Sequence, residues 1–307
     1  MPLALSTSWN AYRYTDAKSM LFEIKQLGFN NIELSFNLTG SMLDEIAKSA
    51  HVFGLDITSL HNYCPIPEGL SREDALPDCY SISSLNPGER KLAVKYSKRT
   101  IDTAHSLGAS AVVLHCGRVE IKDRTKELIF LYNNGKKDSR EFKGLKEAFI
   151  KERSLVAKDF LDSALYSIEE LSLCAAEKGI LLGIENRFYY REIPSFEEIG
   201  IILGKFKGAN VFYWHDTGHA KVMQNLGFTE GDNYLKAYAQ EMAGIHLHNV
   251  AGCLDHQPLN KGELDFLEFK PYLKKETLKV IEAHQPATAV DIEESRRLLE
   301  GIFNGIL

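Results

Sequence analysis

The chain has few features of a secreted, membrane or nucleic-acid-binding protein. Its five cysteines are scattered and form no C-x-x-C pair, which disfavours a disulfide scaffold and favours reduced thiols. No apolar run is long enough to span a membrane, and no basic-then-apolar signal pattern opens the chain. Lys and Arg number 36 against 42 Asp and Glu, so the net charge of −6 offers nucleic acid no general attraction. We therefore expect a cytoplasmic protein.

Glycine-rich phosphate loops are also missing. No G-x-G-x-x-G follows the first apolar segment, and no Walker-type loop is present. Their absence weakens the prediction of an open, doubly wound sheet. The composition, 44% hydrophobic and 25% charged over 307 residues, is that of an ordinary globular protein with one large α/β domain or two ordinary ones.

Apolar segments alternate with helical patterns along the whole chain. Eight segments are predicted as buried strands: 3–8, 31–36, 55–61, 110–115, 180–185, 210–216, 243–248 and 278–284. Helices are predicted at 16–27, 42–53, 89–107, 154–177, 196–206, 231–242, 264–273 and 291–303. Because parallel neighbours need crossover connections, strict alternation predicts a parallel sheet. Eight units predict a single-domain (β/α)₈ TIM barrel over residues 1–307.

Two insertions interrupt this pattern, at about 62–88 and 117–151. The first is proline-rich, and a loop of that length is uncommon without a function. Residues 136–153, which overlap the end of the second insertion, carry seven Lys or Arg against four Asp or Glu. This charge pattern favours a solvated helix and loop, with a lid for an anionic substrate as the alternative.

Six consecutive predicted strands end on residue types that bind metals. These residues are His61, His115, Glu185, Asp216, His246 or His248, and Glu282. Alone, Asp216 would equally be a cap of the following helix, and a lone glutamate usually pairs with Lys or Arg. In a barrel, however, these strand ends converge on one rim, where uncompensated carboxylates would be costly. The set predicts a divalent metal, Mn²⁺, Mg²⁺, Co²⁺ or Zn²⁺.

The motifs at these strand ends resemble those of the xylose isomerase-like TIM barrel superfamily, which includes sugar phosphate isomerases and epimerases and endonuclease IV. They are 60–63 (LHNY), 114–117 (LHCG), 184–187 (IENR), 215–219 (HDTGH), 245–249 (IHLHN) and 280–282 (VIE). The resemblance implies one metal held by Glu185, Asp216, His246 and Glu282. The family has an acid three residues after its ligand histidine, where Asn249 stands here, so His248 remains an alternative to His246.

The resemblance implies a metal-dependent isomerase or epimerase of a sugar or sugar derivative. Such an enzyme moves a proton next to a carbonyl through an enediolate, which the metal stabilises. Glu185 and Glu282 would act as base and acid. His61 and His219 would contact hydroxyls or relay protons, and Arg187 would orient the substrate or pair with an acid such as Glu185. A small sugar is the expected partner, and a homo-oligomer is left open.

Two other functions are weighed against this one. The first is phosphodiester hydrolysis at abasic DNA, as in endonuclease IV, for which the candidate ligands of further zinc ions are His61, His115, His219, His248 and His256. The second is a non-catalytic barrel that binds a sugar or a metal. In the endonuclease IV pattern, an acid stands two residues before a ligand histidine. The corresponding histidine here is His256, and Leu254 occupies the place of the acid, which disfavours a full three-metal site. Glu33 is expected in a buried ion pair, and His215 is expected to be structural.

Overall fold

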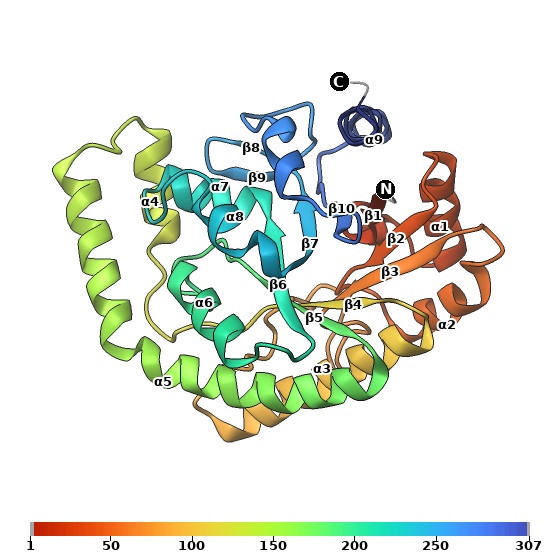
Figure 1. Cartoon of the computed structure of the whole chain (residues 1–307), viewed down its shortest axis with the longest axis horizontal. Helices are drawn as coiled ribbons and strands as arrows, with labels where there is room; N and C mark the ends of the chain where they lie inside the picture. The colour runs from red at the N-terminus through yellow and green to blue at the C-terminus, as the bar shows by residue number, and fades with distance from the viewer. Residues whose placement is uncertain (1–2, 306–307) are drawn as a thin grey trace.

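The computed structural model describes residues 3–305, in which eight parallel strands close into a barrel. The strands follow one another around the barrel in chain order, and the last one pairs with the first (Figure 1). They are β1 (Leu3–Ser6), β2 (Asn31–Leu34), β3 (Asp56–His61), β4 (Ala111–Leu114), β5 (Leu181–Glu185), β6 (Val211–Asp216), β7 (Met242–Leu247) and β10 (Leu278–Ile281). The predicted (β/α)₈ barrel is confirmed.

Helices cover the outside of the barrel, and most begin at a side-chain cap. They are α1 (Ala17–Gln26), α2 (Gly40–Ser49), α3 (Pro87–Ser106), α4 (Thr125–Asn133), α5 (Arg140–Lys178), α6 (Phe196–Lys205), α7 (Thr217–Asn225), α8 (Asn233–Tyr238) and α9 (Ala289–Phe303). Ser195 and Glu198 form a capping box at α6, and Thr288 and Asp291 form another at α9. Within residues 3–305, no helix is long and apolar enough to cross a membrane.

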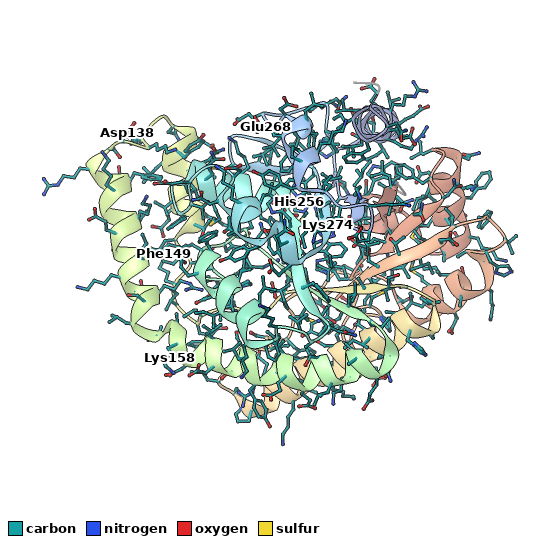
Figure 2. All side chains as sticks on the ribbon, viewed as in Figure 1. Asp138, Phe149, Lys158, His256, Glu268 and Lys274 are labelled. Carbon is teal, nitrogen blue, oxygen red and sulfur yellow. The ribbon has the colours of Figure 1, made fainter. Side chains whose placement is uncertain are left out.

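The longest helix, α5, differs from its prediction. It begins at Arg140 rather than near residue 154, because Ser139 caps it and Phe142 and Phe149 are buried against α4 and α7. In Figure 2, Phe149 points from α5 toward the body of the molecule and Lys158 points away. The expected break before 154 is therefore wrong. Residues 140–153 extend the helix on the outside of the barrel. None of residues 136–153 lines the metal-centre cavity described below, which argues against a lid.

The segment after β7 also departs from prediction. β7 ends at Leu247, so His248 lies beyond it, and the antiparallel pair β8 (Asn249–Ala251) and β9 (Leu254–Gln257) follows. The helix expected at 264–273 is a 3₁₀ helix, η4 (Phe266–Tyr272). The hairpin carries His256 back over the carboxyl ends of the strands, where its backbone C=O accepts a hydrogen bond from the N–H of His284.

Trp214 fills the barrel interior beneath the rim. Its ring is fully buried between Gly183 and Gly244, where a Cβ added to either glycine would lie 2.6 Å or 2.2 Å from Trp214 atoms. These two glycines therefore permit the close approach of the indole. The imidazole of His246 meets Trp214 edge-on at a centroid distance of 5.2 Å, so Trp214 is the floor of the polar site above it.

Candidate metal centre

Three carboxylates and one imidazole meet at the carboxyl ends of β5, β6, β7 and β10. Glu185 and Asp216 end their strands, His246 lies in β7 opposite Asp216, and Glu282 follows β10. The candidate ligand atoms of these four residues, called the metal cluster below, all lie within 4.8 Å of one another. Nδ1 of His246 lies 2.7 Å from Glu185, 2.9 Å from Glu282 and 3.8 Å from Asp216.

The charges of the metal cluster call for a cation. Burial alone would raise the pKa of Glu185 and Glu282, but the neighbouring histidines outweigh it and lower both. Burial would likewise lower the pKa of His246, but Glu282 and Glu33 hold it well above its usual value. Carboxylates therefore outnumber the imidazole in a buried site, and a divalent cation would compensate them. Three oxygen donors and one nitrogen suit the predicted metals.

Glu33 orients the imidazole of His246. Its carboxylate is fully buried, lies 3.1 and 3.2 Å from Nε2 of His246, and accepts a hydrogen bond from Ser59 at 2.8 Å. A proton on Nε2 leaves the Nδ1 lone pair facing the other carboxylates, as a metal ligand requires. Glu33 was expected in a buried ion pair, and its partner in that pair is His246.

His248 holds the carboxylate of Asp216 in place by a hydrogen bond. Its Nδ1 accepts a hydrogen bond from the backbone N–H of His256 at 2.8 Å, and its Nε2 donates to Asp216 at 2.9 Å. Both ring nitrogens are thus occupied within the protein. Asp216 also caps α7 by accepting from the N–H of His219 at 2.6 Å, so the cap and the cluster are compatible roles.

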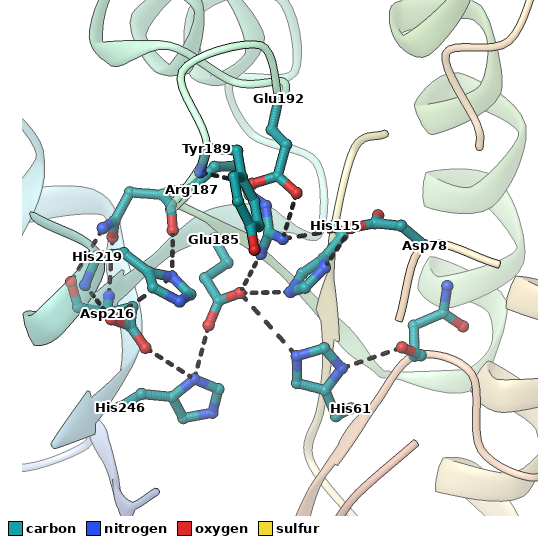
Figure 3. Close-up of polar contacts among 12 residues, drawn as sticks. His61, Asp78, His115, Glu185, Arg187, Tyr189, Glu192, Asp216, His219 and His246 are labelled. Carbon is teal, nitrogen blue, oxygen red and sulfur yellow. Dashed lines mark hydrogen bonds and ion pairs between the residues drawn. The ribbon is translucent and has the colours of Figure 1, made fainter. Parts of the chain in front are cut away.

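A second group of candidate ligands lies beside the first. His61, His115 and Glu185 offer atoms within 4.8 Å of one another, and Nε2 of His115 lies 2.6 Å from Glu185. That nitrogen is buried and has no hydrogen-bond partner despite the contact. A cation that bound both atoms would account for it. Asp78, in the loop before α3, holds Nδ1 of His115 at 3.1 Å and thereby turns Nε2 toward Glu185 (Figure 3).

Arg187 forms the ion pair that was one of its two expected roles. Its guanidinium lies 2.8 Å from Glu185, 3.3 Å from Asp78 and 3.2 Å from Glu192. These carboxylates raise the pKa of Arg187 although burial lowers it. Asp78 and Glu192 were not recognised from the sequence, because both lie in loops where no periodicity or motif distinguishes them.

A third group gathers around the hairpin. Nδ1 of His219 donates to the backbone C=O of Asn186 at 3.0 Å, and its Nε2 faces Asp255 at 3.7 Å. His256 has a left-handed backbone with φ of 52° and stacks on His284 at a centroid distance of 3.9 Å. Asp216, His219 and His256 offer ligand atoms within 4.8 Å of one another. His284 ends a predicted strand, but no motif in the sequence distinguishes it as a site residue.

The site opens into a cavity of about 230 Å³, called the metal-centre cavity. Its wall includes Glu185, Glu282, Arg187 and several histidines, together with Phe36, Phe188 and Tyr189. His215 lies on the other face of β6, where its Nδ1 donates a hydrogen bond to the hydroxyl oxygen of Tyr213 at 2.7 Å. It therefore lies outside the metal cluster.

Several solved structures, sugar epimerases among them, are similar to this chain over its length. A D-tagatose 3-epimerase-like protein is 18% identical with a TM-score of 0.71, over 100% of this chain and 98% of its own. The 3-keto-D-glucoside 4-epimerase YcjR from E. coli is 14% identical with a TM-score of 0.67, over 98% and 99%. The IOLI protein with a bound zinc atom is 15% identical with a TM-score of 0.68, over 100% and 99%. At such identities the likeness shows the fold alone.

Sequence comparison provides the stronger assignment. No curated protein matches the chain. A family model described as xylose isomerase-like TIM barrel matches residues 21–301, which is most of the sequence. That span includes every barrel strand except β1 and every residue of the metal cluster. The chain belongs to the xylose isomerase-like TIM barrel family.

Proposed function

We propose that the protein is a metal-dependent epimerase or isomerase that moves a proton next to the carbonyl of an uncharged sugar. The observation that carries the proposal is the placement of Glu185 and Glu282. They come from β5 and from the end of β10, approach the same nitrogen of His246 and line the same cavity. Two carboxylates around one small cavity are the pair needed to remove a proton and to return one.

Each residue of the site has a definite task in this reaction. A divalent cation bound by Glu185, Asp216, His246 and Glu282 would stabilise the negative charge that develops on the sugar oxygens. One glutamate takes the proton from the carbon, and the other returns a proton to the enediolate. His219 and Asp255 both line the metal-centre cavity, and Nε2 of His219 lies 3.7 Å from the Asp255 carboxylate. This nitrogen can accept a hydrogen bond from a sugar hydroxyl.

The cavity favours an uncharged substrate. Among the described residues, Arg187 is the one Lys or Arg in its wall, and its guanidinium already pairs with Glu185, Asp78 and Glu192. A phosphate group would therefore meet carboxylates and no free cation. The volume of about 230 Å³ is below the roughly 300–1,000 Å³ of drug-sized ligand sites and suits one sugar ring.

Exchange of substrate C–H with solvent deuterium tests the proposal. Protein loaded with Mn²⁺ in D₂O should exchange the hydrogen next to the carbonyl of a ketohexose such as D-fructose, as followed by NMR. Glu185→Gln and Glu282→Gln should each lower the exchange rate by about 10²- to 10⁴-fold. Metal content is measured in parallel, because both residues are also proposed ligands. Glu268→Gln, on η4 and outside the metal-centre cavity, is the control. Full exchange in both site variants would refute the two-glutamate mechanism.

The clustering of the other ligands favours one further candidate, zinc-dependent cleavage of a phosphodiester. His61, His115 and Glu185 form one potential site and Asp216, His219 and His256 another, beside the metal cluster. Elemental analysis and a nicking assay on abasic duplex DNA separate the candidates. About three zinc ions per chain with strand cleavage would favour the nuclease, whereas one metal with C–H exchange favours the epimerase. Sugar binding without exchange or cleavage would indicate a binding protein.

A further inference from the structure

A second cavity adjoins the metal-centre cavity. It has a volume of about 240 Å³, and Arg187 and Tyr189 line both cavities. Both residues belong to the loop between β5 and α6, which directly follows Glu185. Figure 3 shows Tyr189 beside Arg187 and above Glu185. Arg187 and Tyr189 therefore form a wall common to the two cavities, and a ligand that spans both cavities would extend past Tyr189.

The second cavity has an aromatic lining, so it is called the aromatic cavity. Its aromatic residues besides Tyr189 are Tyr190, Phe196, Phe228 and Tyr234. Tyr190 and Phe228 stack with a centroid distance of 4.0 Å and an interplanar angle of 10°, and Phe196 meets Tyr234 edge-on at 5.3 Å. Stacking covers one face of each of the Tyr190 and Phe228 rings, and the remaining aromatic surface of the lining offers apolar contact area at a low cost in conformational entropy.

Polar atoms without partners accompany these rings. The hydroxyl of Thr229 and Nε of Arg187 are buried, and neither has a hydrogen-bond partner in the described chain. Both residues line the aromatic cavity, and Arg187 is 7% exposed. Buried polar groups are normally satisfied, so two unpaired groups at one cavity indicate a ligand that supplies hydrogen bonds.

The remaining polar lining describes that ligand further. Glu192, Ser195 and Glu197 also line the cavity, which disfavours an anion and suits hydroxyl groups. Apolar ring faces with hydroxyl-binding groups around them match the two faces and the rim of a sugar ring. We propose that the aromatic cavity binds the second sugar ring of a glycosylated ketose, whose ketose unit reacts in its open-chain keto form at Glu185 and Glu282. This inference rests on the function proposed above and specifies its substrate class.

Binding of a remote ring should appear in the rate of the chemical step. In each turnover the C–H bond breaks, its proton passes to a glutamate, and a deuteron from solvent returns to carbon. The glycosylated ketoses isomaltulose and maltulose should show kcat/KM for exchange roughly 10- to 100-fold above that of D-fructose, because remote contacts help to place the reacting carbon.

Two variants distinguish recognition from stability. Thr229→Val removes a hydroxyl that has no partner in the chain, so thermal stability should hold or rise while the ratio of disaccharide to D-fructose kcat/KM falls by roughly 3- to 10-fold. Phe228→Leu keeps an apolar side chain but removes the ring face, and the same ratio should fall about 10-fold. Phe130→Leu, on the exposed face of α4, is the matched control and should leave the ratio unchanged.

The outcomes separate this inference from the proposed function. Exchange of D-fructose with no preference for either disaccharide, or an unchanged ratio in both variants, would overturn the aromatic cavity as a sugar site while the proposed function stands. If no sugar exchanges, the proposed function fails, and saturation-transfer NMR with cellobiose tests the cavity directly. A signal in the wild type that Thr229→Val and Phe228→Leu weaken supports the sugar site, and equal or absent signals refute it.

Discussion

Replacing Glu33 with glutamine is expected to weaken metal binding, although Glu33 is not a ligand in the proposed site. Its carboxylate lies 3.1 and 3.2 Å from Nε2 of His246 and is fully buried. Burial alone would raise the pKa of Glu33, but His246 lowers it, so the group is charged at neutral pH. Glutamine keeps an acceptor for the Nε2 proton but replaces a charge-assisted hydrogen bond with a neutral one.

The magnitude follows from the role of such partners in metal sites. Removal of a carboxylate that orients a ligand histidine typically costs 10- to 100-fold in metal affinity, or about 1.4–2.7 kcal/mol. The metal cluster should lie in this range, because Glu33 is the described group that fixes Nε2 of His246 while Nδ1 faces the cation. The unfolding free energy should change little, since the variant removes one buried negative charge among several.

Isothermal titration with Mn²⁺ measures the effect, with circular dichroism as the check on folding. Ser59→Ala is the matched control, because Ser59 donates to Glu33 at 2.8 Å but leaves its carboxylate facing His246. Affinity in this control should stay within about threefold of the wild type. If Glu33→Gln binds Mn²⁺ within twofold of the wild type while His246→Ala loses binding, Glu33 does not orient the ligand.

Three further predictions concern stability. Chelation should lower Tm, because the carboxylates of the metal cluster then lose their cation. Restoring the metal at 100 times its Kd should raise the free energy of unfolding by about 2.7 kcal/mol, and an unchanged Tm in calorimetry would rule out the site. Glu198→Gln should cost about 3–5 kcal/mol in urea unfolding, because it leaves buried Arg153 without its partner at 2.7 Å, and a loss below 1 kcal/mol would contradict this. Lys279→Met should add roughly 1 kcal/mol at pH 7, since burial lowers the pKa of Lys279 to about 8 and the native state binds its proton less tightly than the unfolded chain. That advantage should be largest below pH 8 and disappear as pH rises toward 10.5; a pH-independent difference would contradict it.

Much of the fold could be predicted because its signals are local. An apolar run that ends in polar residues, such as Val211–Asp216, reveals both a buried strand and the side chain at its rim. The start of α5 was missed for the opposite reason. Residues 136–153 are basic, and the contacts of Phe142 and Phe149 with α4 and α7 that stabilise a helix there come from other segments.

The candidate site divides in the same way. By itself the sequence determined that Glu185, Asp216 and Glu282 stand at or just beyond the ends of strands, because strand periodicity and length are short-range properties. Only the tertiary structure decided how the histidines are used. Whether His246 or His248 faces the cluster depends on Glu33, which lies 213 residues before His246, and on the backbone of His256 in an unpredicted hairpin. Hydrogen bonds between distant segments fix the direction of each ring nitrogen, and no pattern within one segment encodes that direction.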